Sequence, residues 1–118
     1  MSKSYQIFLE EHISKEKMDS IVNHLEGYET SNGHYTIQDG EATIWVNYAE
    51  FDSDLDYYAS ENAEILSEYQ LKINYILDVE VGSDEQSEVL VQKFYSGLKK
   101  EYPKSVIMNQ DGKFFEKL

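Results

Sequence analysis

The chain has 118 residues, 41% of them hydrophobic and 14% aromatic, which predicts a single folded domain over residues 1–118 and argues against intrinsic disorder. Its formal net charge is −13, from 23 carboxylates against 10 bases, and every base is a lysine. The lack of arginine and the negative field argue against nucleic-acid binding, and the lack of cysteine excludes disulfides, thiolate nucleophiles and cysteine-ligated metals.

The first half of the chain predicts a strand, a helix and a meander of short strands. Residues 5–9 form a short apolar strand, and Ser14 is the expected N-cap of a helix whose apolar positions run from Met18 to Leu25. Gly27 is the expected stop of that helix. The turn pairs at residues 32–33 and 39–40 bracket a short strand, and alternation predicts a longer one over residues 41–51.

The second half predicts a long strand, a second helix and a terminal hairpin. Every second residue over 71–81 is apolar (Leu71, Ile73, Tyr75, Leu77, Val79 and Val81), which predicts a strand with these side chains on one face. Ser83 and Gln86 have the spacing of a capping box, so the helix is expected to begin there and to end before Pro103. Residues 106–108 are expected to pair with residues 114–115. Between the halves, residues 52–69 favour a short helix, with an acidic loop as the alternative.

These elements predict an α+β fold with a mostly antiparallel sheet and two main helices on one face, broadly a ferredoxin-like α/β sandwich. No apolar run approaches the roughly 20 residues of a membrane helix, and no signal peptide is apparent. We therefore expect a soluble cytoplasmic protein that has no association with membranes.

No constellation of residues indicates catalysis, a metal site or a cofactor. The run Asp52-Ser-Asp54-Leu-Asp56 resembles the start of a calcium loop, but Tyr57 and Ala63 stand where an EF-hand needs glycine and a bidentate glutamate. The three histidines have no partners at the spacing of metal ligands, and no nucleophile elbow or phosphate-binding loop is present. The prediction is a protein that is not an enzyme.

The charge is concentrated in one interval. Between Lys17 and Lys72 there are 12 of the 23 carboxylates and no lysine, and aromatic residues crowd the same interval. Tyrosine and tryptophan are enriched in interface hot spots, and the surrounding carboxylates suit a basic protein partner. The predicted partner-binding residues are Trp45, Tyr48, Glu50, Asp52, Asp54, Asp56, Tyr57, Tyr58, Glu61 and Glu64.

A small, acidic, cysteine-free α+β chain with such a surface resembles the immunity proteins that bacteria make against secreted polymorphic toxins. The resemblance is one of type and rests on residues 45–56, which begin WVNYAEF, and on the terminal hairpin SVIMNQDGKFFE. It implies a non-catalytic inhibitor that blocks a basic toxin or nuclease domain through charge complementarity.

Two other functions are compatible with the residues. One is a DNA mimic that inhibits a nucleic-acid-binding enzyme, with the carboxylates from Glu50 to Asp56 standing for phosphates. The other is a small ligand-binding or enzymatic domain with a pocket between the helices and the sheet.

Overall fold

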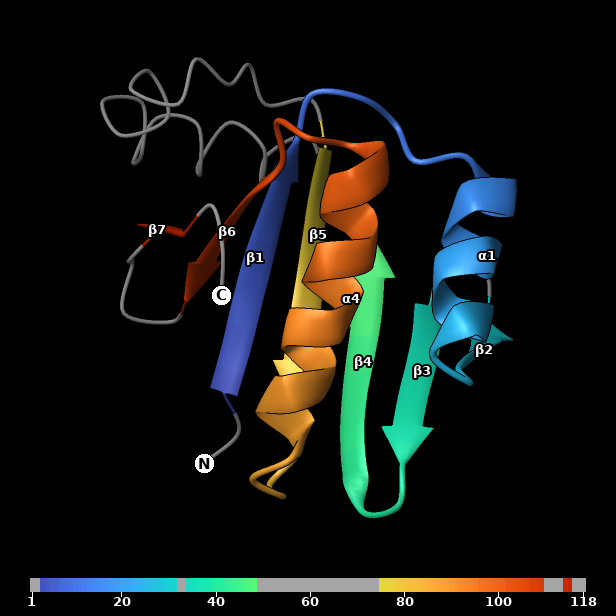
Figure 1. Cartoon of the computed structure of the whole chain (residues 1–118), viewed down its shortest axis with the longest axis vertical. Helices are drawn as coiled ribbons and strands as arrows, with labels where there is room; N and C mark the ends of the chain where they lie inside the picture. The colour runs from blue at the N-terminus through green and yellow to red at the C-terminus, as the bar shows by residue number, and fades with distance from the viewer. Residues whose placement is uncertain (1–2, 32–33, 49–74, 110–113, 116–118) are drawn as a thin grey trace.

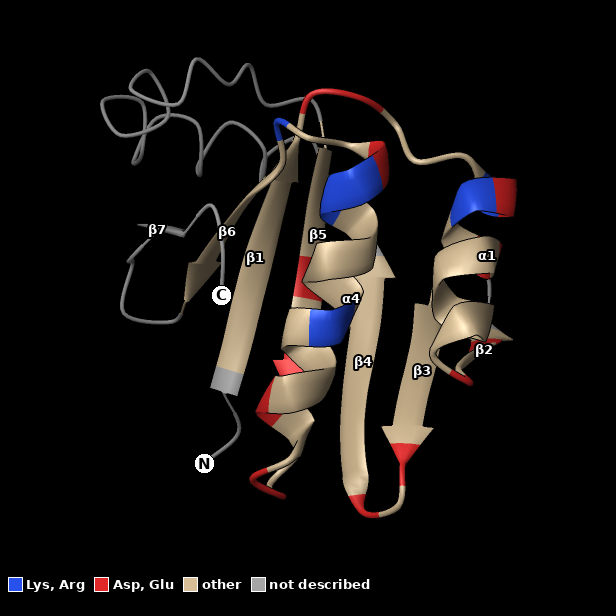
Figure 2. Cartoon of the chain, in the orientation of Figure 1, with Lys and Arg blue, Asp and Glu red and all other residues tan. Residues whose placement is uncertain are grey.

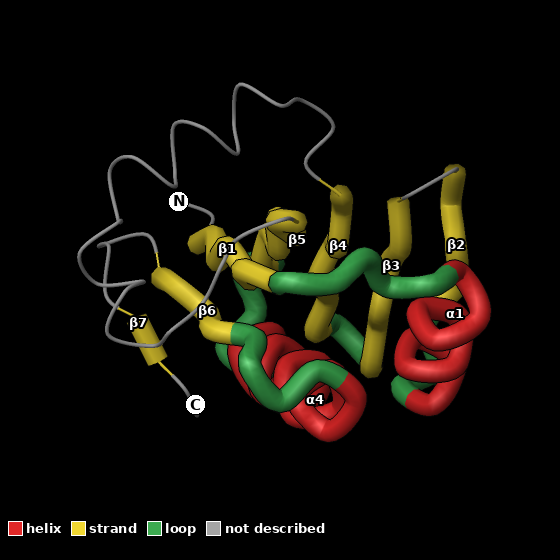
Figure 3. Tube along the Cα trace, turned by 90° about the horizontal axis from the view of Figure 1, so that it is seen from above, coloured by secondary structure: helices red, strands yellow, loops and turns green. Residues whose placement is uncertain are grey.

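In the part of the chain that the structure describes, one antiparallel sheet carries two helices on one face (Figures 1 and 3). The computed structural model describes residues 3–31, 34–48, 75–109 and 114–115. In chain order the elements are β1 (Lys3–Leu9), α1 (Lys15–His24), β2 (Tyr28–Ser31), β3 (His34–Asp39), β4 (Ala42–Tyr48), β5 (Tyr75–Val81), α4 (Ser87–Glu101), β6 (Val106–Asn109) and β7 (Phe114–Phe115).

The strands lie in the order β2-β3-β4-β5-β1-β6-β7, and each neighbouring pair is antiparallel. The predicted α+β architecture, a mostly antiparallel sheet with both helices on one face, is therefore confirmed. No helix within the described ranges is long and apolar enough to cross a membrane.

The core lies between the helices and the sheet, as the alternation of the strands predicts. Each central strand buries every second side chain in one cluster with the helices, and the members from β1, β4 and β5 include Ile7, Val46 and Val79. Phe94 and Leu98 of α4 are fully buried against them. Burying this apolar surface is the main stabilising contribution to the fold.

The opposite face of the sheet, here called the second face, has two parts. Phe8 pairs with Ile76 on one side and with Val106 on the other, and all three side chains are buried. Toward β4, β3 and β2 the second face instead carries polar residues and an exposed tryptophan. The second face is thus apolar and buried at one end, and polar at the other.

The end of α1 differs in detail from the prediction. Ser14 is the N-cap, and its hydroxyl accepts a hydrogen bond from the Lys17 backbone N–H (3.2 Å). The left-handed residue after the helix, however, is Glu26 (φ 61°), not Gly27. Gly27 is needed for a different reason, because a Cβ there would lie 2.7 Å from the Ile37 side chain and 2.8 Å from the Thr36 carbonyl oxygen.

The predicted capping box before α4 is wrong, because the helix begins at Ser87 and not at Ser83. The Asp84 carboxylate accepts a hydrogen bond from the Gln86 backbone N–H (2.9 Å), which closes a turn before the helix. Gln86 makes no side-chain cap bond. The buried Ser87 hydroxyl accepts from the backbone N–H of Thr43 (3.0 Å), so the helix start is tied to β4.

The predicted strands are present, with one addition. The strands predicted over residues 41–51 and 71–81 are seen as β4 and β5, and residues 49–74, including the segment 52–69, lie outside the described residues. The terminal hairpin is confirmed, because Met108 pairs with Phe114 and Ile107 with Phe115. The edge strand β2 was not predicted, since its sequence YETS has no apolar alternation.

A charged cluster holds α1 against β2. The Lys15 ammonium lies 3.3 Å from Asp19 of the same helix and 3.1 Å from Glu29 of β2. These hydrogen bonds raise the pKa of Lys15. The pKa of the Tyr35 phenol is raised as well, chiefly by burial and further by the negative charges of Glu29 and Asp19.

We predict opposite effects of alanine at two glycines. Gly27→Ala is expected to lower the free energy of unfolding by about 1–3 kcal/mol, because the added methyl group overpacks the core. Gly97→Ala in α4 is expected to raise it by up to about 1 kcal/mol, because alanine favours the helix and its Cβ would lie at an ordinary 3.5 Å from Ile21. Urea unfolding of both variants tests this; equal changes would contradict the packing argument.

We also predict an alkaline loss of stability that depends on Tyr35. The folded state holds the phenol proton more tightly than the unfolded chain, so the contribution is complete below about pH 10 and is lost as the pH rises toward the folded pKa. Urea unfolding over a series of alkaline pH values should therefore show a steeper fall for wild type than for Tyr35→Phe. Parallel curves would show that Tyr35 does not contribute.

Candidate functional site

The structure describes two of the ten predicted partner-binding residues. Trp45 is on β4 and projects from the second face with 40% of its surface exposed. Tyr48 is the last residue of β4, three positions after Trp45, and its backbone pairs with Leu77 of β5. The strand therefore places these two positions on opposite faces of the sheet. The other eight (Glu50, Asp52, Asp54, Asp56, Tyr57, Tyr58, Glu61 and Glu64) lie outside the described residues and stay a prediction.

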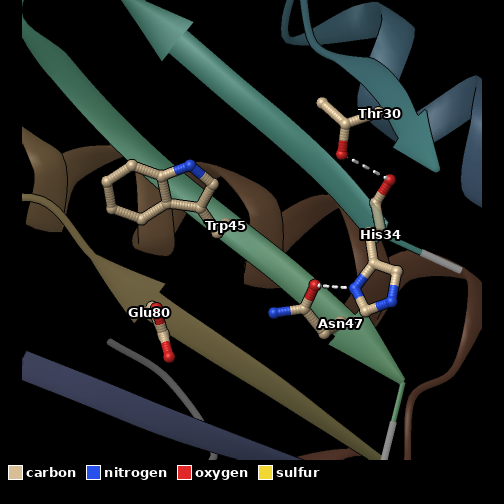
Figure 4. Close-up of a pocket in the computed structure, with 5 residues that line it drawn as sticks. All are labelled: Thr30, His34, Trp45, Asn47 and Glu80. Atoms are coloured by element: carbon tan, nitrogen blue, oxygen red, sulfur yellow. Dashed lines mark hydrogen bonds between the residues drawn. The ribbon is translucent and has the colours of Figure 1, made fainter.

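Around Trp45 the second face forms a shallow, open depression, here called the Trp45 depression. Figure 4 shows its side chains on four neighbouring strands, in the order Thr30 (β2), His34 (β3), Trp45 and Asn47 (β4) and Glu80 (β5). It is open to solvent and is not an enclosed cavity. The indole of Trp45 and four polar side chains line it, which is the character of a contact surface more than of a buried ligand pocket.

Hydrogen bonds fix the polar side of the depression. His34 Nδ1 and Asn47 Oδ1 are hydrogen-bonded at 2.5 Å, and the Thr30 hydroxyl donates to the His34 carbonyl oxygen (3.3 Å). With Asn47 Oδ1 as acceptor, the proton of this pair is on Nδ1 of His34. The Asn47 side chain is therefore held in one orientation beside the tryptophan.

The same polar row continues across the sheet. His34 pairs with Asn47, Asn47 with Asp78, and Asp78 with Gln6, so one row crosses β3, β4, β5 and β1. The Gln6 amide donates to Asp78 Oδ1 at 3.4 Å. Polar groups that bond one another across strands keep a row of side chains ordered on a face that is partly open to water.

Negative charge lies directly beside the tryptophan. Trp45 is paired with Glu80 across β4 and β5, and such cross-strand neighbours have Cβ atoms about 5 Å apart. Asp78 lies two residues before Glu80 on the same side of β5, and none of the described residues that line the depression is a lysine. An aromatic face beside a carboxylate suits a cationic group, because the ring quadrupole and the carboxylate both attract positive charge.

The described residues contain no group of three or more His, Asp or Glu side chains placed to hold a metal ion. What the depression offers chemically is therefore hydrogen-bonding groups, an aromatic surface and a carboxylate.

Sequence reasoning identified Trp45 but not its neighbours. Alternation along residues 41–51 places Trp45 and Asn47 on the same face, and this was the one available signal. Thr30, His34 and Glu80 come from other strands, up to 50 positions apart in the chain, and join Trp45 only through strand order and register.

Comparisons of the chain with protein-family models, with curated proteins and with solved structures found no match.

The local field at Trp45 is open to a direct test, since it is the single tryptophan of the chain. We predict that neutral acrylamide quenches its fluorescence more effectively than iodide does, because the nearby carboxylates repel the anion. Glu80→Gln should increase iodide quenching while leaving acrylamide quenching unchanged. Glu85→Gln removes the same charge away from the depression and should have a smaller effect; equal effects would show that only net charge matters.

Proposed function

We propose that this protein is a non-catalytic binding module that holds a basic protein partner against the second face of its sheet. The observation that carries the proposal is the exposure of Trp45 beside Glu80, in a chain with a net charge of −13. An exposed tryptophan in a shallow polar surface has the features of an interface hot spot.

The distribution of charge supports this orientation of the partner. The two helices together carry five lysines against four carboxylates, so the helical layer has a slight positive balance within an acidic chain. Figure 2 shows the lysines of α1 and α4 on that layer. The second face carries Asp78 and Glu80 on β5, and a basic surface would be steered toward it.

The ordered polar row supports a preorganised surface. Because Asn47 is bonded to His34 and Asp78 to Gln6, their polar groups lose little additional freedom when a partner binds. A Lys or Arg side chain of the partner would lie over the indole with its charge toward Glu80. Main-chain or hydroxyl groups of the partner would bond to the Asn47 amide.

The type of inhibitor follows from the resemblance to bacterial immunity proteins. We propose that the partner is a basic toxin or nuclease domain, that the protein acts in the cytoplasm by blocking that domain, and that it binds no nucleic acid. The small size, the acidic composition and the aromatic residues in the sequence 45–56 support this proposal.

We predict that Trp45→Ala weakens partner binding about 30-fold or more, because truncating a hot-spot side chain costs about 2 kcal/mol of binding free energy. Glu80→Lys should mainly slow association, with the largest effect at low salt. The measurement is capture of partners from a lysate of the source organism at low and high salt, followed by titration of the captured protein with each variant.

Matched controls separate the surface from the fold and from net charge. Val89→Ala truncates an apolar side chain on α4 that is 37% exposed, and Glu85→Lys makes the same charge change as Glu80→Lys at another site. Both controls should keep the partner. If the captured protein is a nuclease or another toxin domain, wild type should inhibit its activity stoichiometrically. Retention of the partner by Trp45→Ala would contradict the proposed surface.

A further inference from the structure

A groove between α1 and α4 is the second surface feature, and it lies on the helical layer, away from the Trp45 depression. Its volume is about 200 Å³. Figures 1 and 3 show the two helices side by side on the same face of the sheet. The groove, here called the helix groove, is lined by Ser20, Ile21, His24, Leu25, Lys93, Gly97, Lys100 and Glu101.

Two lysines of the helix groove differ from the others whose side chains are described. Lys15 is paired with Asp19 and Glu29, Lys104 with Glu10, and Lys17 with Glu101. Lys99 donates to the Ser105 carbonyl oxygen and lies over the Tyr95 ring. Within the described part of the chain, Lys93 and Lys100 have no such partner, although carboxylates outnumber lysines by 23 to 10. Both line the same groove.

The spacing along α4 directs both lysines to this groove. Lys93 precedes Gly97 by four residues and Lys100 follows it by three, and positions three and four apart share one side of a helix. His24, in the last turn of α1, faces them across the groove. Glu101 also lines the groove, but its carboxylate is engaged by the Lys17 ammonium at 3.4 Å.

Gly97 keeps the floor of the helix groove open. Glycine inside a helix is unfavourable relative to alanine, so its use there calls for a reason. Close packing is not that reason, since an added Cβ would meet one atom, Ile21 Cγ2, at an ordinary 3.5 Å. The missing side chain leaves an apolar floor formed by Ile21 and Leu25 between the two lysines.

We infer that the helix groove binds a small organic anion, a carboxylate or phosphate monoester with a compact apolar body. The acidic group would lie between Lys93 and Lys100, and the apolar body over Ile21, Leu25 and Gly97. The volume agrees with this size, since a cavity of about 150 Å³ accommodates benzene. This site is independent of the proposed partner surface, because it lies on the other side of the sheet.

The test uses phenyl phosphate as the probe, in an NMR titration of backbone amides of the intact chain. We expect saturable shifts at Gly97 and Ser20. Inorganic phosphate lacks the apolar body and benzyl alcohol lacks the charge, so each should bind at least tenfold more weakly. Binding of benzyl alcohol as tight as that of phenyl phosphate would overturn the inference.

Variants distinguish local contact from net charge. Lys93→Gln and Lys100→Gln should each weaken phenyl phosphate binding five- to tenfold, and Gly97→Leu should abolish it by filling the floor. Lys104→Gln makes the same change in net charge outside the groove and should stay within twofold of wild type. Equal weakening by Lys104→Gln, or shifts confined to residues outside the groove, would refute the site. Trp45→Ala should leave phenyl phosphate binding unchanged. A negative result for the helix groove would therefore not bear on the proposed partner surface at Trp45.

Discussion

The antiparallel pairing of β1 with β5 is the interaction on which the rest of the structure depends. It joins residues 3–9 to residues 75–81 through seven register pairs, from Lys3 with Val81 to Leu9 with Tyr75. The same register puts Ile7 and Leu77 into the core and Gln6 and Asp78 onto the second face. A slip by one residue would exchange the faces of β1, so the apolar core and the polar row would be lost together. The polar row beside Trp45 therefore depends on the same strand register as the apolar core.

The sequence was sufficient where a local pattern determines the structure. Alternation predicted β4 and β5, and Ser14 predicted the start of α1, because both signals depend on neighbours within a few residues. The predicted capping box is not formed. Asp84 accepts the hydrogen bond of the Gln86 backbone N–H, and Ser87 accepts that of Thr43, which is 44 residues away. The composition of the Trp45 depression could not be predicted for the same reason, since strand order and register are long-range properties.

Lysines of the helical layer form ion pairs, whereas Asp78 and Glu80 lie on the second face of the sheet. Lys15 links α1 to β2, Lys17 links α1 to α4 through Glu101, and Lys104 contacts Glu10 after β1. Exposed pairs of this kind contribute little stability individually, and the buried side chains of α1 and α4 in the core fix the helices on the sheet. The helical layer thereby uses most of its cations internally and leaves Lys93 and Lys100 for the helix groove. The carboxylates of β5 remain on the other side of the sheet.

The limit of the polar surface is set by β5 itself. Along its second-face positions the strand changes from buried Ile76 to Asp78 and then to exposed Glu80. An ionised carboxylate is costly to bury without a partner, so the buried apolar part must end before Asp78, which receives a hydrogen bond from Gln6. On the β4 side, the second-face neighbours of Asp78 and Glu80 are Asn47 and Trp45. Ile76, Asp78 and Glu80 thus mark where the buried apolar part of the second face ends and where its exposed polar part begins.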